Sequence, residues 1–348
     1  MIGRIHKNKI CKGTLALALC LMLCVGCRPA SNSERQSGVD FFFDTVITLT
    51  TYGVDESVIR DAFAMCAEFE QLLSRTKEGS DVWNINHAEG QAVTVSVHTR
   101  TLIEKALYYS ELSRGAFDIT IAPVVELWDF TGGTENVPDS ALVEERARLV
   151  GYGQIRLSGN TVTLPAGCQI DFGAIAKGYI ADKLADFMRG EGVESAMLNL
   201  GGNVYVIGSK PDGSHWNVGL QDPFGEMGKP FAGYAAQDLS VVTSGTYERG
   251  FIKENVLYHH ILDTATGWPV NNGVTSITII SPYSVDGDAL STACFALGKE
   301  AGLELVESLP GIECIFVMLD GEVVCSSGAA QSLLIDAAWN AAYSGTPR

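Results

Sequence analysis

Basic residues are scarce in this chain. It has 24 lysines and arginines against 41 aspartates and glutamates, a formal net charge of −17, and four of the basic residues fall within its first 12 positions. Binding to nucleic acid depends on clustered lysine and arginine side chains that contact phosphates. The composition therefore excludes nucleic acid as a partner and argues against general adhesion to anionic lipids.

The chain also lacks a cysteine pattern typical of a metal site. After Cys27 the cysteines are scattered, with no C-x-x-C pair and no histidine at metal-binding spacing. Most lie in apolar runs, which predicts buried thiols that pack as small hydrophobic side chains. One disulfide remains open in an oxidising compartment. The five cysteines are Cys66, Cys168, Cys294, Cys314 and Cys325.

The N-terminal apolar run, residues 14–25, is too short to cross a bilayer, which takes roughly 20 residues. A basic start, a short apolar run and a small residue before a cut site are the layout of a secretory signal. The end of the run resembles the lipobox of bacterial lipoproteins, although Cys24 stands where leucine is usual. We expect a signal peptide over residues 1–26, a lipid on Cys27 and a flexible spacer to residue 38, with the protein held at the extracytoplasmic face of a cell membrane. An uncleaved anchor, or cleavage without lipid, remains an alternative.

Residues 39–348 are predicted to form one catalytic domain of the α+β class. Apolar side chains recur at helical spacing over residues 59–73, 99–112, 174–188, 288–297 and 300–307. Strand-forming residues prevail over 41–52, 150–172 and 195–281, and Asp320-Gly321 predicts a tight hairpin turn. Because helices and strands follow in mixed order, we expect mixed, largely antiparallel sheets with flanking helices.

The stretch from Asp171 to Lys177 combines an acid, a glycine turn and the start of a helix. Free N–H groups and the positive end of the helix dipole make such a start a natural seat for phosphate. A lysine is unfavourable at that position unless an anion compensates its charge. The equally open alternative is that Asp171 only caps the helix while Lys177 lies in solvent.

Asp288 and Thr292 are four residues apart, so on a helix they share one face. One carboxylate and one hydroxyl form a small ligand set that suits Mg²⁺, which keeps waters or substrate phosphates as its other ligands. The alternative is that Asp288 only caps the helix. Asp286, two residues earlier, is a second candidate for the metal.

Two further stretches give weaker signals. Gly201 and Gly202 lie between predicted strands, where paired glycines let a ligand approach the backbone. Thr243 and Ser244 belong to a hydroxyl-rich turn that precedes a strand with His260, a candidate base. A lone strand histidine is nevertheless more often structural. The chain has no Walker loop, no G-x-G-x-x-G after a strand and no G-x-S-x-G motif.

Taken in this order, the stretches resemble the ApbE family, the FAD:protein FMN transferases, from about Phe43 to about Ala337. Each piece is short, but the ordered set is specific. The pieces are residues 43–45, 73–76, 80–81, 115–120, 123–128, 170–178, 199–203, 243–245, 258–267 and 288–292.

The resemblance implies a fold related to the T-fold and a reaction that depends on Mg²⁺. FMN passes from FAD to a threonine hydroxyl of a partner protein, a phosphoester bond forms, and AMP leaves. The implied acceptors are flavin-carrying subunits of membrane redox complexes and related extracytoplasmic flavoproteins.

The resemblance also implies roles for single residues. Asp171 and Lys177 would contact FAD, and the carbonyl of Ala174 would hold Mg²⁺ together with Asp288 and Thr292. His260 would take the proton from the acceptor threonine, which makes His260 and Asp288 the implied catalytic residues. The other residues implied to line or approach the FAD pocket are Phe43, Thr76, Ala116, Phe117, Asp118, Gly201, Gly202, Thr243 and Ser244.

Two departures from the family pattern leave alternatives open. Thr76 stands where many relatives carry an aromatic residue that could stack on the adenine, and Phe43 stands where methionine is common. An FAD pyrophosphatase that uses water as its nucleophile is therefore the first alternative. A non-catalytic FAD-binding lipoprotein is the second, and the pairing of Asp288 with Thr292 argues against it.

Overall fold

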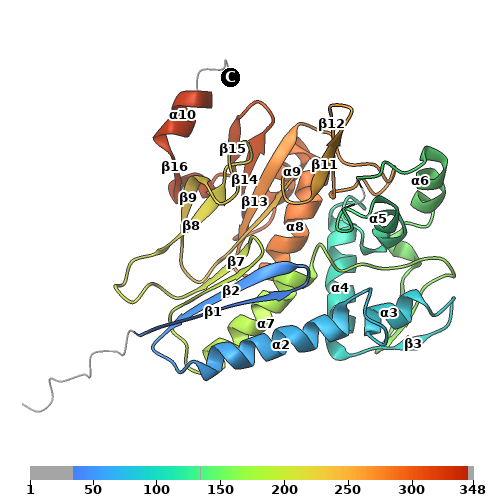
Figure 1. Ribbon diagram of the computed structural model, residues 1–348, viewed down its shortest axis with the longest axis horizontal. Helices are drawn as coiled ribbons and strands as arrows, with labels where there is room; N and C mark the ends of the chain where they lie inside the picture. Colours follow the sequence, from blue (N-terminus) through green and yellow to red (C-terminus); the bar gives the residue numbers. More distant parts are fainter. Residues whose placement is uncertain (1–33, 134, 344–348) are drawn as a thin grey trace, which may run out of the picture.

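The computed structural model describes residues 34–133 and 135–343, so Cys27, the predicted signal peptide and residues 28–33 of the predicted spacer lie outside the described residues. Its largest element is an eight-stranded sheet in the order β1-β2-β6-β7-β10-β13-β14-β15 (Figure 1). Every neighbouring pair in this sheet is antiparallel. The strands are β1 (Arg35–Phe42), β2 (Thr45–Tyr52), β6 (Ala196–Leu200), β7 (Asn203–Ile207), β10 (Ser240–Gly245), β13 (Val274–Ser281), β14 (Glu313–Met318) and β15 (Val323–Cys325).

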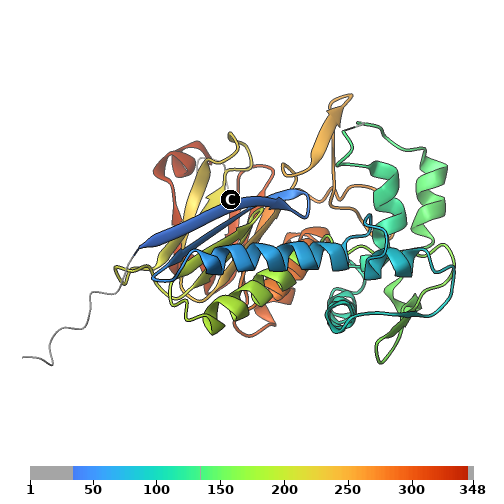
Figure 2. The same cartoon turned by 60° about the horizontal axis from the view of Figure 1, so that its bottom comes forward.

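Three smaller antiparallel sheets accompany the large one. The first joins β8 (Trp216–Gln221), β9 (Pro230–Ala236) and β16 (Leu333–Ile335), and the second joins β3 (Val93–Thr94), β4 (Arg156–Ser158) and β5 (Thr161–Thr163). The third is the hairpin of β11 (Gly250–Lys253) and β12 (Val256–His259), which stands out from the body in Figure 2. The predicted α+β class with largely antiparallel sheets is confirmed.

The helices pack along one face of the large sheet and gather in a lobe at one end of it (Figure 1). The sheet-packing helices are α2 (Ser57–Leu73), α7 (Ala176–Gly190), α8 (Ser284–Leu297) and α9 (Lys299–Glu307). The lobe contains α3 (Asp81–Asn86), α4 (Val97–Leu112), α5 (Ala122–Trp128) and α6 (Ser140–Ala147), and α10 (Ala337–Tyr343) closes the described chain. Among the described residues, no helix is long and apolar enough to span a membrane.

The centre of the large sheet is buried on both faces, which explains why every residue of β13 is buried. Ile277 and Ile279 face the main core beneath the helices, whereas Ile280 faces a second core. That second core is covered by β8, β9 and Trp339 of α10. Because alternate side chains of a strand point to opposite faces, a strand covered on both sides becomes a continuous apolar run.

The β1–β2 hairpin begins earlier than the sequence predicts. β1 starts at Arg35, which pairs with Tyr52, so Arg35 to Gly38 belong to the strand and not to the flexible spacer. Gly38 lets α2 pack closely against β1, because a Cβ atom at this position would lie 2.7 Å from the Cγ2 of Ile59. The two-residue turn at Phe43 and Asp44 has positive φ at both positions, as a tight hairpin turn of this type requires.

The predicted helices and turns are present, with one shifted boundary. α8 begins at Ser284, four residues before the predicted start at Asp288. Its first N–H groups, those of Ser284 and Val285, donate to the carboxylate of Asp182 in α7 at 2.7 and 3.0 Å. The cap is therefore supplied by another helix, and Asp288 is not a helix cap.

The cysteine prediction is confirmed for burial. Cys66, Cys168, Cys294 and Cys314 are buried and Cys325 is half-buried, and all five are free thiols. The disulfide left open by the sequence does not form among them. Burial raises the pKa of the Cys66 thiol to about 12, so it packs as a neutral apolar group.

α7 and α8 cross at Gly178 with almost no space between them. A Cβ atom at Gly178 would lie 2.3 Å from the carbonyl oxygen of Ser284 and 2.7 Å from the Cβ of Asp288. Both contacts involve atoms fixed by α8, so the two helices come this close only because position 178 has no side chain.

The substitution Gly178→Ala is expected to lower the free energy of unfolding by about 2 kcal/mol or more, because the added methyl forces α7 away from α8. Urea unfolding followed by circular dichroism measures this. Gly190→Ala in the same helix is the matched control, since nothing lies within 4 Å of a Cβ there. The control should be unchanged or slightly more stable. Equal stability of the two variants would contradict the close crossing.

Candidate active site

The N-terminal parts of α7 and α8 bring two predicted site residues, Lys177 and Asp288, together. Asp288, in the second turn of α8, is only 4% exposed. Its Oδ2 accepts a hydrogen bond from the amide of Gly178 at 2.9 Å, and its Oδ1 lies 3.6 Å from the Nζ of Lys177. The carboxylate therefore has one neutral donor and one cation, and it remains within reach of the start of α7.

The start of α7 leaves one carbonyl without a donor. Gly178 is the third residue of α7 after its N-cap Ile175, so its amide is one of the first N–H groups of the helix, which have no partner within it. That amide donates to Asp288, and within the described part of the chain no N–H donates to the carbonyl of Ala174, which precedes the helix. The free oxygen thus belongs to a residue four positions before Gly178, where α7 meets α8.

The donor set fits Mg²⁺. Asp288 supplies a carboxylate, Ala174 a free carbonyl, and Thr292 a hydroxyl one helical turn after Asp288 on a half-buried position. Among the described residues no group of three His, Cys, Asp or Glu side chains is placed to hold a metal. A hard cation bound here would thus take several ligands from water or from substrate phosphates, which is typical of Mg²⁺.

Asp286 is not part of this donor set. Its Oδ1 accepts a hydrogen bond from the hydroxyl of Tyr109 at 2.6 Å and lies 3.6 Å from the Nζ of Lys105, both on α4. Burial and the neighbouring Asp286 raise the pKa of the Tyr109 hydroxyl. Asp286 thus joins α8 to α4, and Asp288 is the candidate ligand for the metal.

Asp171 does not cap α7, and Lys177 is not a lysine free in solvent. The N-cap of α7 is Ile175, which makes no side-chain capping bond. Lys177 donates through Nζ to the carbonyl of Gly173 at 3.2 Å, in addition to its contact with Asp288. Asp171 accepts from the amide of Gly173 at 2.7 Å and pairs with the Nε of Arg75 at 2.9 Å. Both side chains are therefore held at the start of α7.

A loop after α2 connects Asp171 with the β1–β2 turn. Arg75 in this loop pairs with Asp171, and Lys77 pairs with Glu70, whose Oε1 accepts from the amide of Phe43 at 2.7 Å. Thr76 lies exposed between them. The structure thus places Phe43, Thr76 and Asp171 around one loop through Arg75 and Glu70, neither of which the sequence singled out.

His260 directly follows β12, and its ring is held by one backbone oxygen. Its Nδ1 lies 3.2 Å from the carbonyl of Arg249, to which its own amide also donates. A carbonyl only accepts, so Nδ1 carries the proton and Nε2 has a free lone pair. Burial, with the nearby charges of Arg249 and Lys177, lowers the pKa of His260 to about 3. The neutral ring can accept a proton at Nε2.

Glu248 is a residue of this region that the sequence analysis missed. Glu248 as a whole residue is exposed, but desolvation of its carboxyl group raises its pKa to about 7; the charge of Asp288 acts in the same direction, and Lys177 and Arg249 oppose the rise. In the sequence, Glu248 directly follows the hydroxyl-rich stretch at residues 243–247, and this position was the one indication of its role. It adds a second carboxylate to the electrostatics around Lys177 and Asp288.

The side chains of Phe117 and Asp118 do not face an open pocket. Phe117 is 1% exposed and belongs to the main core. The Asp118 carboxylate accepts hydrogen bonds from the amide and hydroxyl of Thr120 and from the amide of Tyr152. Both side chains thus hold the loop together from inside, and their place at the FAD pocket stays a prediction. Only Ala116 beside them is half-exposed.

The remaining predicted residues pack at the edge of the site. The hydroxyls of Thr243 and Ser244 in β10 bond to those of Thr278 and Ser291, each at 2.8 Å. Gly201 and Gly202 have positive φ in the β6–β7 turn. A Cβ at Gly201 would lie 2.0 Å from the hydroxyl of Thr45, so its glycine is explained by the approach of the β1–β2 hairpin. These residues surround the site without adding a charge to it.

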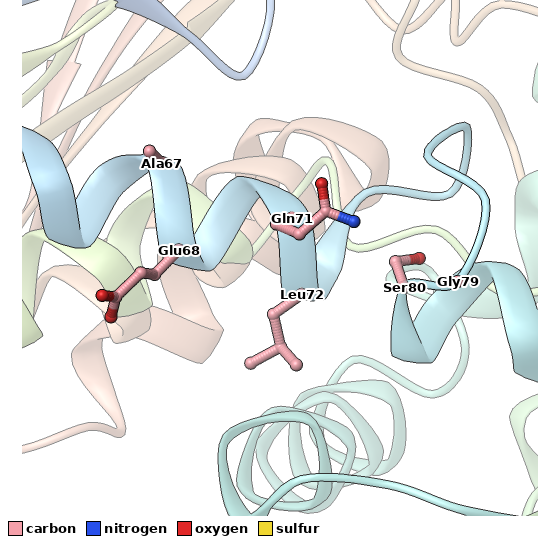
Figure 3. Close-up of a pocket in the computed structure, with 6 residues that line it drawn as sticks. All are labelled: Ala67, Glu68, Gln71, Leu72, Gly79 and Ser80. Carbon is pink, nitrogen blue, oxygen red and sulfur yellow. The ribbon is translucent and has the colours of Figure 1, made fainter.

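A surface hollow of about 490 Å³ lies elsewhere, along α2 (Figure 3). Its lining has one carboxylate and no cation, which does not suit an anionic dinucleotide. None of the predicted site residues lines it. The lining residues are Ala67, Glu68, Gln71, Leu72, Gly79 and Ser80.

Comparison with known proteins gives a consistent result. The ApbE family matches residues 43–316. The chain is 38% identical to an FAD:protein FMN transferase of Klebsiella pneumoniae, over 81% of this chain and 88% of that protein. It is 33% identical to one from Treponema pallidum, over 90% of this chain and 93% of that protein. A crystal structure of the ApbE protein from Thermotoga maritima superposes with a TM-score of 0.80 at 31% identity, covering 86% of this chain and 99% of that one.

The imidazole of His260 is expected to stay neutral, with the proton on Nδ1, from pH 8 to pH 5, because its pKa lies at about 3. Nitrogen NMR shifts of the ring measure both the charge and the tautomer. The signal is assigned by its loss in the variant His260→Gln. A titration with a midpoint near the ordinary histidine value of 6.5 would contradict the buried, neutral ring.

Proposed function

Because this chain belongs to the ApbE family, we propose that it is an FAD:protein FMN transferase. The single structural observation that supports this most strongly is the Asp288 carboxylate held against the start of α7 by the Gly178 amide and the Lys177 ammonium, with the undonated carbonyl of Ala174 just before that helix. A carbonyl and a carboxylate for a hard cation, next to a lysine at a helix start, suit a diphosphate. We propose that the diphosphate of FAD binds there.

The reaction moves one phosphoryl centre. The hydroxyl of an acceptor threonine attacks the phosphorus of the FMN half of FAD, a new P–O bond forms, and the P–O bond to AMP breaks. The hydroxyl proton passes to Nε2 of His260, and AMP leaves with the bridging oxygen. Nδ1–H of His260 stays bonded to the Arg249 carbonyl, which fixes the ring and stabilises it when it becomes protonated. The family relation and the tautomer support this assignment.

The residues of α7 and α8 position the phosphates. Lys177 lies between the Gly173 carbonyl and Asp288, so its charge is held at the helix start where a phosphate would bind. We propose that Ala174, Asp288 and Thr292 hold Mg²⁺, which when bound neutralises negative charge on the phosphates. Asp171, fixed by Arg75, closes the other side of this helix start.

Hydrolysis of FAD to FMN and AMP is the second candidate function, and one observation favours it. Thr76 is exposed and its hydroxyl bonds to Ser74 at 3.1 Å, so no ring stands at that position to stack on adenine. Release of AMP from FAD without an acceptor protein, at the rate seen with one, would favour the hydrolase over the transferase.

We also propose that a lipid on Cys27 holds the enzyme at the extracytoplasmic face of the membrane, where flavin-carrying subunits of redox complexes are its acceptors. The basic start and the sequence before Cys27 support the anchor. β1 begins at Arg35 and reaches the turn at Phe43 after eight residues. The strand thus spans roughly 25 Å from Arg35 to the turn, and a tether raises the local concentration of membrane-bound acceptors.

Asp288→Asn is expected to reduce FMN transfer by on the order of 100-fold or more, because the amide cannot hold a hard cation as a carboxylate does. The variant keeps an oxygen that can accept from Gly178, so the fold should persist. Transfer is measured by in-gel flavin fluorescence and release of AMP after incubation with FAD, Mg²⁺ and a purified extracytoplasmic flavoprotein subunit.

Asp286→Asn serves as the matched control. It changes a carboxylate on the same helix that bonds to Tyr109, and it is expected to transfer FMN within about threefold of the wild-type rate. Undiminished transfer by Asp288→Asn, or an equal loss in both variants, would reject the proposed metal site. Absence of any labelled protein with the wild-type chain would reject the transferase itself.

A further inference from the structure

The β11–β12 hairpin exposes apolar side chains on one face. Ile252 and Leu257 are directly paired across the two strands, and they are 70% and 46% exposed. Val256, at the tip, is also exposed, but it lies on the opposite face of the hairpin. An apolar pair that stays exposed to water does not contribute the favourable free energy of burial. Contiguous exposed apolar surface often marks an interaction site.

The opposite face of this hairpin is the one that anchors it. Phe251 and Tyr258, the neighbouring pair in the register, pack against each other. Phe251 contacts the ring of Phe130, and Tyr258 contacts that of Trp128 at 5.6 Å between centroids. The hairpin is thus held by one face and stands away from the body with the other face uncovered (Figure 2).

The exposed hairpin is continuous with the proposed base. Arg249 precedes β11 and His260 follows β12, and the carbonyl of Arg249 accepts both from the amide of His260 and, at 3.2 Å, from its Nδ1. The guanidinium of Arg249 also donates to the carbonyl of Asp44 at 3.4 Å. The base of the hairpin therefore joins His260 to the β1–β2 turn.

The β1–β2 hairpin carries a second exposed apolar pair beside that turn. Phe41 and Val46 are direct cross-strand partners and are 62% and 54% exposed. They flank the turn that contains Phe43 and Asp44, to which Arg249 is bonded. Two uncovered apolar pairs thus lie on hairpins that are linked through Arg249, the residue that also bonds to His260.

We propose that these two pairs, Phe41–Val46 and Ile252–Leu257, form the docking surface for the acceptor protein. The occupant is a segment of that protein with apolar side chains around its threonine, which the hairpins hold while the hydroxyl meets Nε2 of His260. This inference rests on the proposed transferase function, because only a macromolecular acceptor needs a surface beyond the FAD site. Burial on docking would remove the exposed apolar area from water.

The test uses the full chain with the double substitution Ile252→Thr and Leu257→Thr, since threonine keeps the strand propensity while removing apolar surface. The value of kcat/KM for a purified extracytoplasmic flavoprotein subunit is expected to fall about tenfold or more. Equilibrium binding of FAD, followed by its fluorescence, is expected to change less than about twofold. The conservative variant Ile252→Val, Leu257→Ile should retain wild-type kcat/KM.

Leu334→Thr is the matched control, because Leu334 is a 68% exposed strand residue in β16, a strand that pairs with β9 and not with either hairpin. It should behave as wild type. Equal transfer by the double variant and the wild type overturns the docking surface, and so does an equal loss of FAD binding, which would place the effect in the FAD site. A dimeric wild type that becomes monomeric in the double variant without loss of transfer would make this face a contact between copies and would likewise overturn it. Absence of transfer by the wild type rejects the function on which the proposal rests.

Discussion

The hydrogen bond from the amide of Gly178 to the carboxylate of Asp288 is the contact on which the site depends. Asp288 accepts from an amide in the first turn of α7 that has no partner within the helix, and the carbonyl of Ala174, just before that helix, accepts no N–H within the described residues. One interaction between two helices thus fixes the carboxylate against the start of α7. It requires glycine at position 178, where a Cβ would overlap Ser284 and Asp288.

The surrounding structure holds this crossing in position. Asp182 caps α8 through two amides, and burial raises its pKa to about 6, so it is mostly ionised at neutral pH and a strong acceptor. The hydroxyl of Ser284 donates to Asn203 and accepts from Ser240, which ties the start of α8 to the sheet. Asp286 binds Tyr109 and so ties the helix to the lobe. Residues 284, 285 and 286 of α8 therefore fix the position of the helix. Asp288 is not used for this and remains available to bind a metal.

Much of the fold and the centre of the site could be predicted from the sequence. The apolar stripe of α2 and the spacing of Asp288 to Thr292 depend on local periodicity, which a sequence displays directly. The start of α8 could not be predicted, because its cap, Asp182, lies 102 residues away in the chain. Asp118 appears in the same motif as pocket residues, but its carboxylate bonds to Thr120 and Tyr152. Glu248, Arg75 and Arg249 were missed because only tertiary contacts bring them to the site.

Ala174, Asp288 and Thr292 are proposed to form one metal site beside Lys177. The most direct measurement is a crystal structure of the full chain with FAD and Mn²⁺, a close substitute for Mg²⁺ that can be located by anomalous scattering. The expected result is a single strong anomalous peak bonded to the Asp288 carboxylate and the Ala174 carbonyl, with the diphosphate against Lys177. A peak bonded instead to Asp286 or to Glu248, with no contact to Asp288 or to the Ala174 carbonyl, would contradict it.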